Sequence, residues 1–330
     1  MFFSRLRPLL LLIIIVALSP VSAATLKIAT LSPEGSQWMK LFRSAAEDIK
    51  TKTDGQVKIK FYPGGVMGDD QAVLKKMRIR QLHGGAMTGG SLTKFYSDSQ
   101  VYSVPLRFDN LEQVTYVRES LDSDILQGYE QSGLVTFGLA GGGFAYIMSK
   151  QPVSHPDHLK GLKVWAPNTD AATVASFDAF SISPIPLPIG DVLAGLQTGL
   201  IDTVATSPVG AITLQWHTQI KYITKVPLVY IYAVLAIDDK AFGRLDASHQ
   251  QVVRKEFGAA FSTLDTSNRE DNEKALQALQ AQGIEIITPA PEEMQEWKRL
   301  GLIASDNMVK NGALSQEIMQ KLEERLASFN

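Results

Sequence analysis

One stretch and its continuation decide the fold class: Gly161-Leu-Lys-Val-Trp165-Ala-Pro167, then Pro186-Leu-Pro188, Leu196-Gln-Thr-Gly-Leu-Ile-Asp202 and Ser207-Pro208. Residues 162–166 are a short, mostly apolar run between a glycine and a proline, which predicts a strand, and residues 202–206 predict another. We expect an extended segment at 185–187 and helices after Asp170 and from Asp191. Because open α/β sheets hold ligands beyond the carboxyl ends of their strands, Trp165 is the first candidate binding residue.

The N-terminal part of the chain repeats this order of elements. Apolar alternation and short apolar runs predict strands at residues 26–30, 57–62 and 84–88. Helical spacing predicts helices between them, the first from Trp38 to the turn at Asp54. Right-handed crossovers would make the three strands parallel. Two copies of one βαβαβ plan predict an α/β protein with two similar lobes.

The segments around these units predict a hinge and a brace. A strand at 134–139 leads to Gly141-Gly-Gly143, where no Lys-Ser/Thr pair follows, so a hinge or a close backbone approach explains the glycines better than a phosphate loop. The β-branched, tyrosine-rich run 226–237 predicts a strand that crosses between the lobes. Residues 247–282 predict a helix on the order of 50 Å long, which is enough to touch both lobes.

Residues 1–24 predict a secretory signal peptide. Arg5 and Arg7 precede an unbroken apolar run, and Val21-Ser-Ala-Ala24 supplies the small residues that a signal peptidase requires. The apolar run is short for a permanent membrane anchor, which is the alternative. We therefore expect cleavage near Ala23 or Ala24 and an exported mature protein.

Composition limits the partners. The chain has 330 residues with 32 Lys and Arg against 34 Asp and Glu, and removal of Arg5 and Arg7 leaves a net charge of about −4. That sign argues against a nucleic-acid partner. The chain has no cysteine, so packing alone must hold the exported protein together, and its length favours two domains.

No motif in the sequence supports an enzyme. His155 and His158 flank a proline in Ser-His-Pro-Asp-His, and because a zinc site needs at least three converging ligands, we interpret them as solvated turn residues. The sequence has no Gly-x-Ser-x-Gly elbow and no cysteine nucleophile, and Gly-x-Gly-x-x-Gly does not follow the first strand. We expect no catalytic residue, no cofactor and no metal.

Ligand binding remains as the function. Two α/β lobes, a signal peptide and a glycine hinge describe an exported solute-binding protein that closes on its ligand. We predict one lobe from residues 25–142 plus 233–283. The second lobe comprises residues 143–232 plus 284–330, which include the C-terminal helices. The ligand would lie in the cleft between the lobes.

The quoted stretches resemble the solute-binding proteins of tripartite ATP-independent periplasmic (TRAP) transporters, DctP type. Further matches extend the resemblance over nearly the whole mature chain: Ser36-Gln-Trp38, Tyr62-Pro-Gly-Gly-Val-Met-Gly-Asp-Asp70 and Val104-Pro-Leu-Arg-Phe108. The resemblance implies a two-lobed periplasmic protein with a long bracing helix. It also implies that the protein carries a small molecule to TRAP membrane permease subunits and catalyses no reaction.

Departures from the family pattern bear on the ligand. Trp165 stands where most members have an arginine, whose planar fork binds a carboxylate, and Ser207 stands where the family has an asparagine before proline. A second basic position of the family falls near Phe144. Tryptophan cannot neutralise a carboxylate, and a buried unpaired anion is costly. We therefore expect an apolar or amphipathic ligand. In lacking this arginine, the protein also resembles the TRAP subgroup that has tetratricopeptide-repeat partner proteins.

The candidate ligand-binding residues lie in or near these motifs: Trp165, Phe144, Ser207, Tyr230, Trp38, Met87 and Arg107. For the aromatic residues, core packing is the alternative role. Arg107 occupies a leucine position of the family, where it would either anchor a carboxylate from a new place or pair with Asp109. Two other functions stay open: binding of an organic acid through Arg107, and a non-transport scaffold or sensor role.

Overall fold

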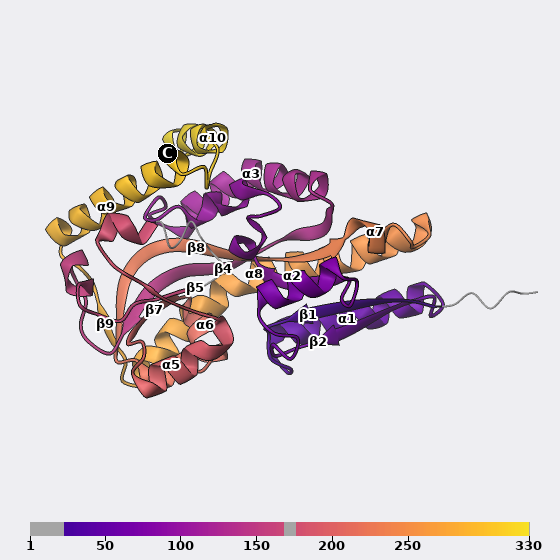
Figure 1. Ribbon diagram of the computed structural model, residues 1–330, viewed down its shortest axis with the longest axis horizontal. Helices are drawn as coiled ribbons and strands as arrows, with labels where there is room; N and C mark the ends of the chain where they lie inside the picture. Colours follow the sequence, from indigo (N-terminus) through magenta and orange to yellow (C-terminus); the bar gives the residue numbers. More distant parts are fainter. Residues whose placement is uncertain (1–22, 168–175, 330) are drawn as a thin grey trace, which may run out of the picture.

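Two long antiparallel strands, β4 (Leu134–Ser149) and β8 (Tyr222–Asp238), form the central ribbon of the molecule (Figure 1). The structure is a computed structural model, and it describes residues 23–167 and 176–329. The two strands pair along their whole lengths, with register shifts between residues 136 and 147 of β4. Bulges of this kind bend and twist a strand, so the ribbon can pass from one lobe to the other.

The other strands extend the central ribbon at its two ends. They are β1 (Ala24–Thr30), β2 (Val57–Tyr62), β3 (Gly84–Thr88), β5 (Trp165–Pro167), β6 (Ile185–Leu187), β7 (Thr203–Thr206) and β9 (Glu285–Ile287). β3 pairs with residues 233–237 of β8, whereas β7 pairs with residues 146–149 of β4 and β9 with residues 222–224 of β8. The resulting sheet has the order β2-β1-β3-β8-β4-β7, with β9 beside β8. Each end of the ribbon therefore belongs to a different lobe.

Helices surround both ends of this sheet (Figure 1). In the described part of the chain they are α1 (Gln37–Lys52), α2 (Asp70–Arg78), α3 (Leu111–Gln131), α5 (Val192–Thr198), α6 (Pro208–Thr213), α7 (Asp239–Phe242), α8 (Ala247–Ala281), α9 (Pro291–Lys310) and α10 (Gln316–Ala327). The side chains of Ser36, Asp69 and Ser207 cap α1, α2 and α6 by accepting hydrogen bonds from backbone N–H groups. These caps fix where the three helices begin.

The first predicted βαβαβ unit is confirmed, and the strand pairing of the second differs from the prediction. β1 pairs in parallel with β2 and β3. β5 and β6 also pair in parallel, but they form a separate small sheet because β7 joins the edge of β4 instead. An isolated bridge between Val164 and Thr203 links the two sheets. The helix predicted after Asp170 begins in residues outside the described part.

Helix α8 braces the molecule, as the sequence predicted. Its 35 residues correspond to about 50 Å. It packs against β4 and α1 and, further along, against α6. Because α1 and α6 lie in different lobes, α8 connects the lobes alongside the central ribbon (Figure 1).

Three polar side chains of α8 bind the backbone of the glycine run. Asp265 accepts a hydrogen bond from the N–H of Gly141 at 2.7 Å, and Asn268 donates to the Gly141 carbonyl at 2.7 Å. Asn272 donates to the Gly142 carbonyl at 3.0 Å. β7 pairs with β4 only from Tyr146 onward, so no strand among residues 23–167 and 176–329 pairs with this edge of β4 at the glycines. The α8 side chains satisfy backbone groups that would otherwise be left unpaired.

The glycine run is a close backbone approach, as predicted. A methyl group added at Gly141 would lie 1.8 Å from the hydroxyl oxygen of Tyr230. One added at Gly143 would lie 2.6 Å from the amide nitrogen of Asn272. Gly143 also has a φ of +90°, which disfavours every residue with a side chain.

Arg118 of α3 connects three elements beside the glycine run. Its buried guanidinium donates to Asp122 at 2.9 Å, to Asp265 of α8 at 2.6 Å and to the Leu139 carbonyl at 2.9 Å. Since a buried cation is stable only when it is paired, these acceptors hold α3, β4 and α8 in one arrangement.

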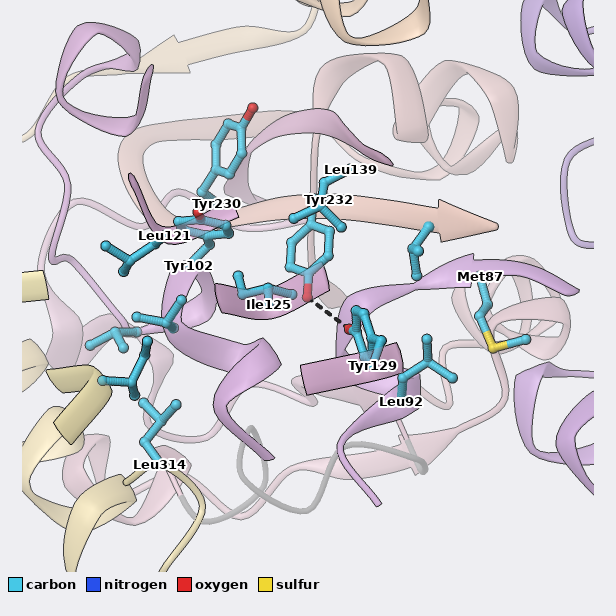
Figure 2. Packing of buried hydrophobic residues seen from close by; sticks show 14 of the residues in the cluster. Met87, Leu92, Tyr102, Leu121, Ile125, Tyr129, Leu139, Tyr230, Tyr232 and Leu314 are labelled. Atoms are coloured by element: carbon cyan, nitrogen blue, oxygen red, sulfur yellow. Dashed lines mark hydrogen bonds between the residues drawn. The ribbon is translucent and has the colours of Figure 1, made fainter. Parts of the chain in front are cut away.

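Tyr102, Tyr129, Tyr230 and Tyr232 lie among aliphatic side chains in the core on one side of the ribbon (Figure 2). The hydroxyls of Tyr129 and Tyr232 are hydrogen-bonded at 2.9 Å, and Tyr232 donates to the Ser99 carbonyl at 2.7 Å. Tyr102 packs edge-on against Tyr232, with ring centroids 5.7 Å apart. Buried tyrosines need such partners for their hydroxyls. The cluster therefore attaches the 3₁₀ segment η2 (Ser97–Ser103) and α3 to β8.

The C-terminal helix α10 packs against α3 (Figure 1). Ion pairs join Lys321 to Asp124 and Arg325 to Glu119. α10 thus lies with residues of the first predicted lobe, although the sequence analysis assigned residues 284–330 to the second. The division of the chain into residues 25–142 plus 233–283 and residues 143–232 plus 284–330 stays a prediction.

No helix in residues 23–167 and 176–329 is long and apolar enough to cross a membrane. Residues 1–22 of the predicted signal peptide lie outside the described residues. The first strand begins at Ala24, next to the predicted cleavage site.

Gly141→Ala should destabilise the protein by about 1–3 kcal/mol, because the added methyl group overlaps the Tyr230 hydroxyl and one of them must move. The free energy of unfolding from urea titrations measures this. Gly190→Ala is the control, since a methyl group there meets no atom within 4 Å. Adding Tyr230→Phe to Gly141→Ala should recover part of the loss. Equal unfolding free energies of Gly141→Ala and Gly190→Ala would contradict the close approach.

Candidate ligand-binding site

A cavity of about 300 Å³ lies between the lobes, and we call it the main cleft. One wall comes from the turn after β3 and from η2, the opposite wall from β5, β7 and α6, and the floor from the central ribbon. Its lining residues are Thr88, Gly89, Gly90, Ser103, Ala145, Trp165, Pro167, Phe177, Ile189, Ala205, Thr206, Ser207, Gly210, Leu214, Trp216, Leu228, Val229, Ile231 and Tyr232. Two predicted residues, Trp165 and Ser207, are therefore brought together.

The ends of β5 and β7 place these two residues. β5 ends at Pro167, and β7 ends at Thr206, directly before the N-cap of α6. Ser207 accepts a hydrogen bond from the Gly210 N–H at 3.2 Å, and Pro208 fills the first helical position, which needs no N–H. Strand ends therefore line the cleft, as the sequence analysis expected.

Trp165 presents apolar surface to the main cleft. Its indole N–H donates to the Leu187 carbonyl at 3.0 Å, so the donor is used within the small β5–β6 sheet. Trp216 packs edge-on against it, with ring centroids 5.1 Å apart. Both rings line the cleft. The position that the resemblance aligns with an arginine thus carries an aromatic wall whose polar atom is already paired.

No charged side chain is among the described residues that line the main cleft. Hydroxyl groups supply most of its polarity, from Thr88, Ser103, Thr206, Ser207 and Tyr232. Hydroxyls can hydrogen-bond to a solute but cannot neutralise its charge. The described residues also contain no group of three or more His, Asp or Glu side chains that could hold a metal ion.

A second cavity of about 80 Å³ adjoins the main cleft, and we call it the inner chamber. It shares wall residues with the main cleft: Ser103, Trp165, Phe177, Ala205, Leu228 and Val229. Its other walls are mostly apolar: Pro105, Ile147, Leu159, Val164, Phe180, Ile182, Val204, Trp297 and Met308, with Gln100, Ser176 and Thr203. No charged side chain occurs among the described residues that line this chamber either.

Phe144 and Tyr230 line neither cavity. They face each other across the β4–β8 ladder, with rings 5.6 Å apart, and line a separate hollow of about 190 Å³ beside α8. The next pair along the ribbon, Ala145 and Val229, lines the main cleft instead. Because successive residues of a strand point to opposite faces, a ligand on Ala145 does not reach Phe144.

Two further candidates, Trp38 and Met87, also lie away from the main cleft. Trp38 packs edge-on against Phe42 and Phe261, with centroids 5.9 and 6.0 Å apart, between α1 and α8. Met87 is buried in the core of the first lobe. Neither side chain lines the main cleft or the inner chamber.

Arg107 is held by the C-terminal helix. Its Nε donates to a carboxylate oxygen of Glu323 on α10 at 2.6 Å, and a second guanidinium nitrogen contacts the other oxygen. Asp109, the partner considered from sequence, pairs with Lys298 at 2.6 Å. Arg107 does not line the main cleft or the inner chamber.

Several lining residues were missed from sequence. Val229 and Ile231 alternate with Tyr230 in the predicted strand, so the assignment of Tyr230 to the ligand placed them on the opposite face. Gln100 and Ser103 carry no such signal, because a 3₁₀ segment has neither strand nor helix periodicity over its length.

A buried carboxyl group lies behind the Thr88 wall of the main cleft. The hydroxyls of Thr88 and Ser91 are hydrogen-bonded at 3.0 Å, and Ser91 donates to Asp70. Burial raises the pKa of Asp70 to about 6, although the hydrogen bonds from Ser91 and the Thr88 backbone oppose this shift. In the folded protein the Asp70 carboxyl group is therefore protonated at mildly acidic pH.

Comparison with known proteins fits this two-lobed geometry. Residues 28–311 match the family model for bacterial extracellular solute-binding protein, family 7 (DctP). The chain belongs to this family. The match covers most of the described residues, including both walls of the main cleft.

Relatives of this family member are 23–24% identical to it over the aligned regions. The 2,3-diketo-L-gulonate-binding periplasmic protein YiaO of Escherichia coli is 23% identical over 84% of each chain. The C4-dicarboxylate-binding periplasmic protein DctP of Rhodobacter capsulatus is 24% identical over 76% of this chain and 80% of that protein.

A solved structure shows the same fold. A TRAP periplasmic solute-binding protein from Haemophilus influenzae with bound L-gulonate superposes with a TM-score of 0.84 at 19% identity. The superposition covers 92% of this chain and 99% of that one. The two-lobed α/β fold of this DctP-family chain is therefore shared with TRAP solute-binding proteins.

Asp70→Asn should gain stability relative to the unmodified protein as pH rises from 4 to 7.5. The folded-state pKa of Asp70 lies above its unfolded value, so folding takes up a proton between about pH 4 and 6. Protonated Asp70 therefore contributes stability below about pH 4, and this contribution falls as pH rises to about 6, above which it is absent. The asparagine stays neutral, so the difference in unfolding free energy between Asp70→Asn and the unmodified protein should change by up to about 3 kcal/mol over this pH range. Thermal melts at several pH values test this. A flat difference for Asp70→Asn would contradict the prediction.

Proposed function

We propose that this DctP-family protein captures an uncharged, apolar or amphipathic small molecule in the main cleft and delivers it to a TRAP membrane permease. The observation that carries the proposal is the lack of any charged side chain among the described residues that line the main cleft and the inner chamber. Hydroxyl groups and aromatic faces suit a neutral solute.

A carboxylate fits this cleft poorly. The relatives named above are described with carboxylates, namely diketo-L-gulonate, C4-dicarboxylates and L-gulonate. In the present cleft such an anion would be enclosed without a described cation to pair with. An unpaired buried charge costs several kcal/mol, a large share of the roughly 8 kcal/mol that micromolar binding provides.

The aromatic wall supplies the attraction for an apolar solute. Trp165 and Trp216 are held edge-to-face, and the Trp165 N–H is already bonded, so neither ring must reorganise to receive a ligand. Burial of apolar surface stabilises by roughly 25 cal/mol per Å², which makes such a preformed wall effective.

The predicted signal peptide and the periplasmic relatives support a periplasmic location. The permease subunits are the partner that the family resemblance implies. A tetratricopeptide-repeat partner stays a prediction from the subgroup resemblance, and co-purification from the native cell tests it. A scaffold or sensor role would be indicated if the protein co-purified with such a partner and no small molecule altered its stability.

Trp165→Arg should abolish binding of the neutral ligand, because a buried guanidinium replaces the apolar wall. Native mass spectrometry of the purified protein measures the bound load directly. Trp165→Phe is the matched control, since it loses the bond to Leu187 but keeps an aromatic face, and it should retain most of the load. A load that consists of a carboxylic acid, or stabilisation of the unmodified protein by L-gulonate or succinate, would contradict the proposal.

Arg107→Ala tests the organic-acid alternative. We expect it to leave ligand binding unchanged and to cost about 1 kcal/mol of stability, through loss of the partly exposed pair with Glu323. Thermal shift assays measure both effects. If organic acids stabilise the unmodified protein but not Arg107→Ala, the relocated anchor is correct and the neutral-ligand proposal is wrong.

A further inference from the structure

Gln100 is a buried polar residue without a partner in the wall of the inner chamber. Its side chain is 3% exposed, and its Oε1 atom has no hydrogen-bond partner in the structure of residues 23–167 and 176–329. Nearly all buried polar atoms in native proteins are paired. The Oε1 atom of Gln100 therefore needs a hydrogen-bond donor, and none of the described residues supplies one.

Two buried polar side chains beside Gln100 in η2 are paired. Asp98 accepts hydrogen bonds from Ser315 at 2.7 Å, and Tyr102 donates to Asp122 at 2.6 Å. The segment is thus firmly attached to α3 and α10, and Gln100 is held in place by its neighbours. Its unpaired state does not reflect a loose segment.

The surroundings of Gln100 define what its partner can be. The inner chamber is lined mainly by aliphatic and aromatic side chains, with hydroxyl groups at Ser103, Ser176 and Thr203. A carboxylate would meet no cation among the described residues there. A carboxamide offers one acceptor and two donors, so a hydroxyl group can both donate to it and accept from it.

We propose that the inner chamber is a specificity subsite that takes one end of the ligand, apolar except for a single hydroxyl group that hydrogen-bonds to Gln100. This inference rests on the proposed function, because it assumes a neutral solute in the adjoining main cleft. Ser103 and Ala205 line both cavities, and their small side chains leave room for one molecule to occupy both.

The test compares three six-carbon probes, 1-hexanol, hexane and hexanoate, by titration calorimetry in a sealed cell. The unmodified protein should bind 1-hexanol more tightly than hexane, and hexanoate most weakly. In Gln100→Met, which keeps the side-chain length and removes the carboxamide, the affinity for 1-hexanol should fall roughly fivefold or more while that for hexane stays or rises. The melting temperature of Gln100→Met should be unchanged or higher, because no internal hydrogen bond is lost.

The outcomes separate the subsite from the proposed function. If both neutral probes bind and their affinity ratio is the same in Gln100→Met, the subsite is overturned and the neutral cleft stands. A lower melting temperature of Gln100→Met would reveal an internal partner and would also overturn the subsite. If hexanoate binds best, or neither neutral probe binds at concentrations up to its solubility in water, the proposed function itself fails.

Discussion

The bent ladder of β4 and β8 is the constraint on which the rest of the structure depends. It must carry the chain between lobes, yet at Gly141 and Gly142 one edge of β4 has no strand beside it in the described part of the chain. Side chains of α8 complete the hydrogen bonding of that edge, and Asp265 also receives Arg118 from α3. Helix α8 therefore braces the molecule in two ways. It packs on both lobes, and its side chains form hydrogen bonds with backbone groups of the ribbon.

The two faces of this ribbon have different surroundings. The face that carries Ala145 and Val229 forms the floor of the main cleft, and the face that carries Phe144 and Tyr230 packs beside α8. Trp165 reaches the cleft from the end of a short strand, with its N–H bonded to Leu187. The cleft that results has aromatic and hydroxyl-bearing walls and no charge among its described residues, which underlies the proposal of a neutral solute.

Local patterns in the sequence were enough to predict most strands and helices, the bracing helix and the close approach at the glycines. Trp165 was found because a strand end is visible in sequence. The orientation of Phe144 and Tyr230 could not be predicted, because it depends on bulges that shift the register of the ribbon. The partner of Arg107 could not be predicted either, because Glu323 lies 216 residues away along the chain. Gln100 lies in a segment without periodicity, so its burial appears only in three dimensions.

A crystal structure of the protein as purified, with the small molecule that it carries, tests the central claim most directly. The account predicts an uncharged molecule lying on Trp165 in the main cleft and reaching toward Gln100. It predicts no lysine or arginine side chain within hydrogen-bonding distance of that molecule. A bound carboxylate paired with a cationic side chain would contradict the account, even if the carboxylate stacked on Trp165.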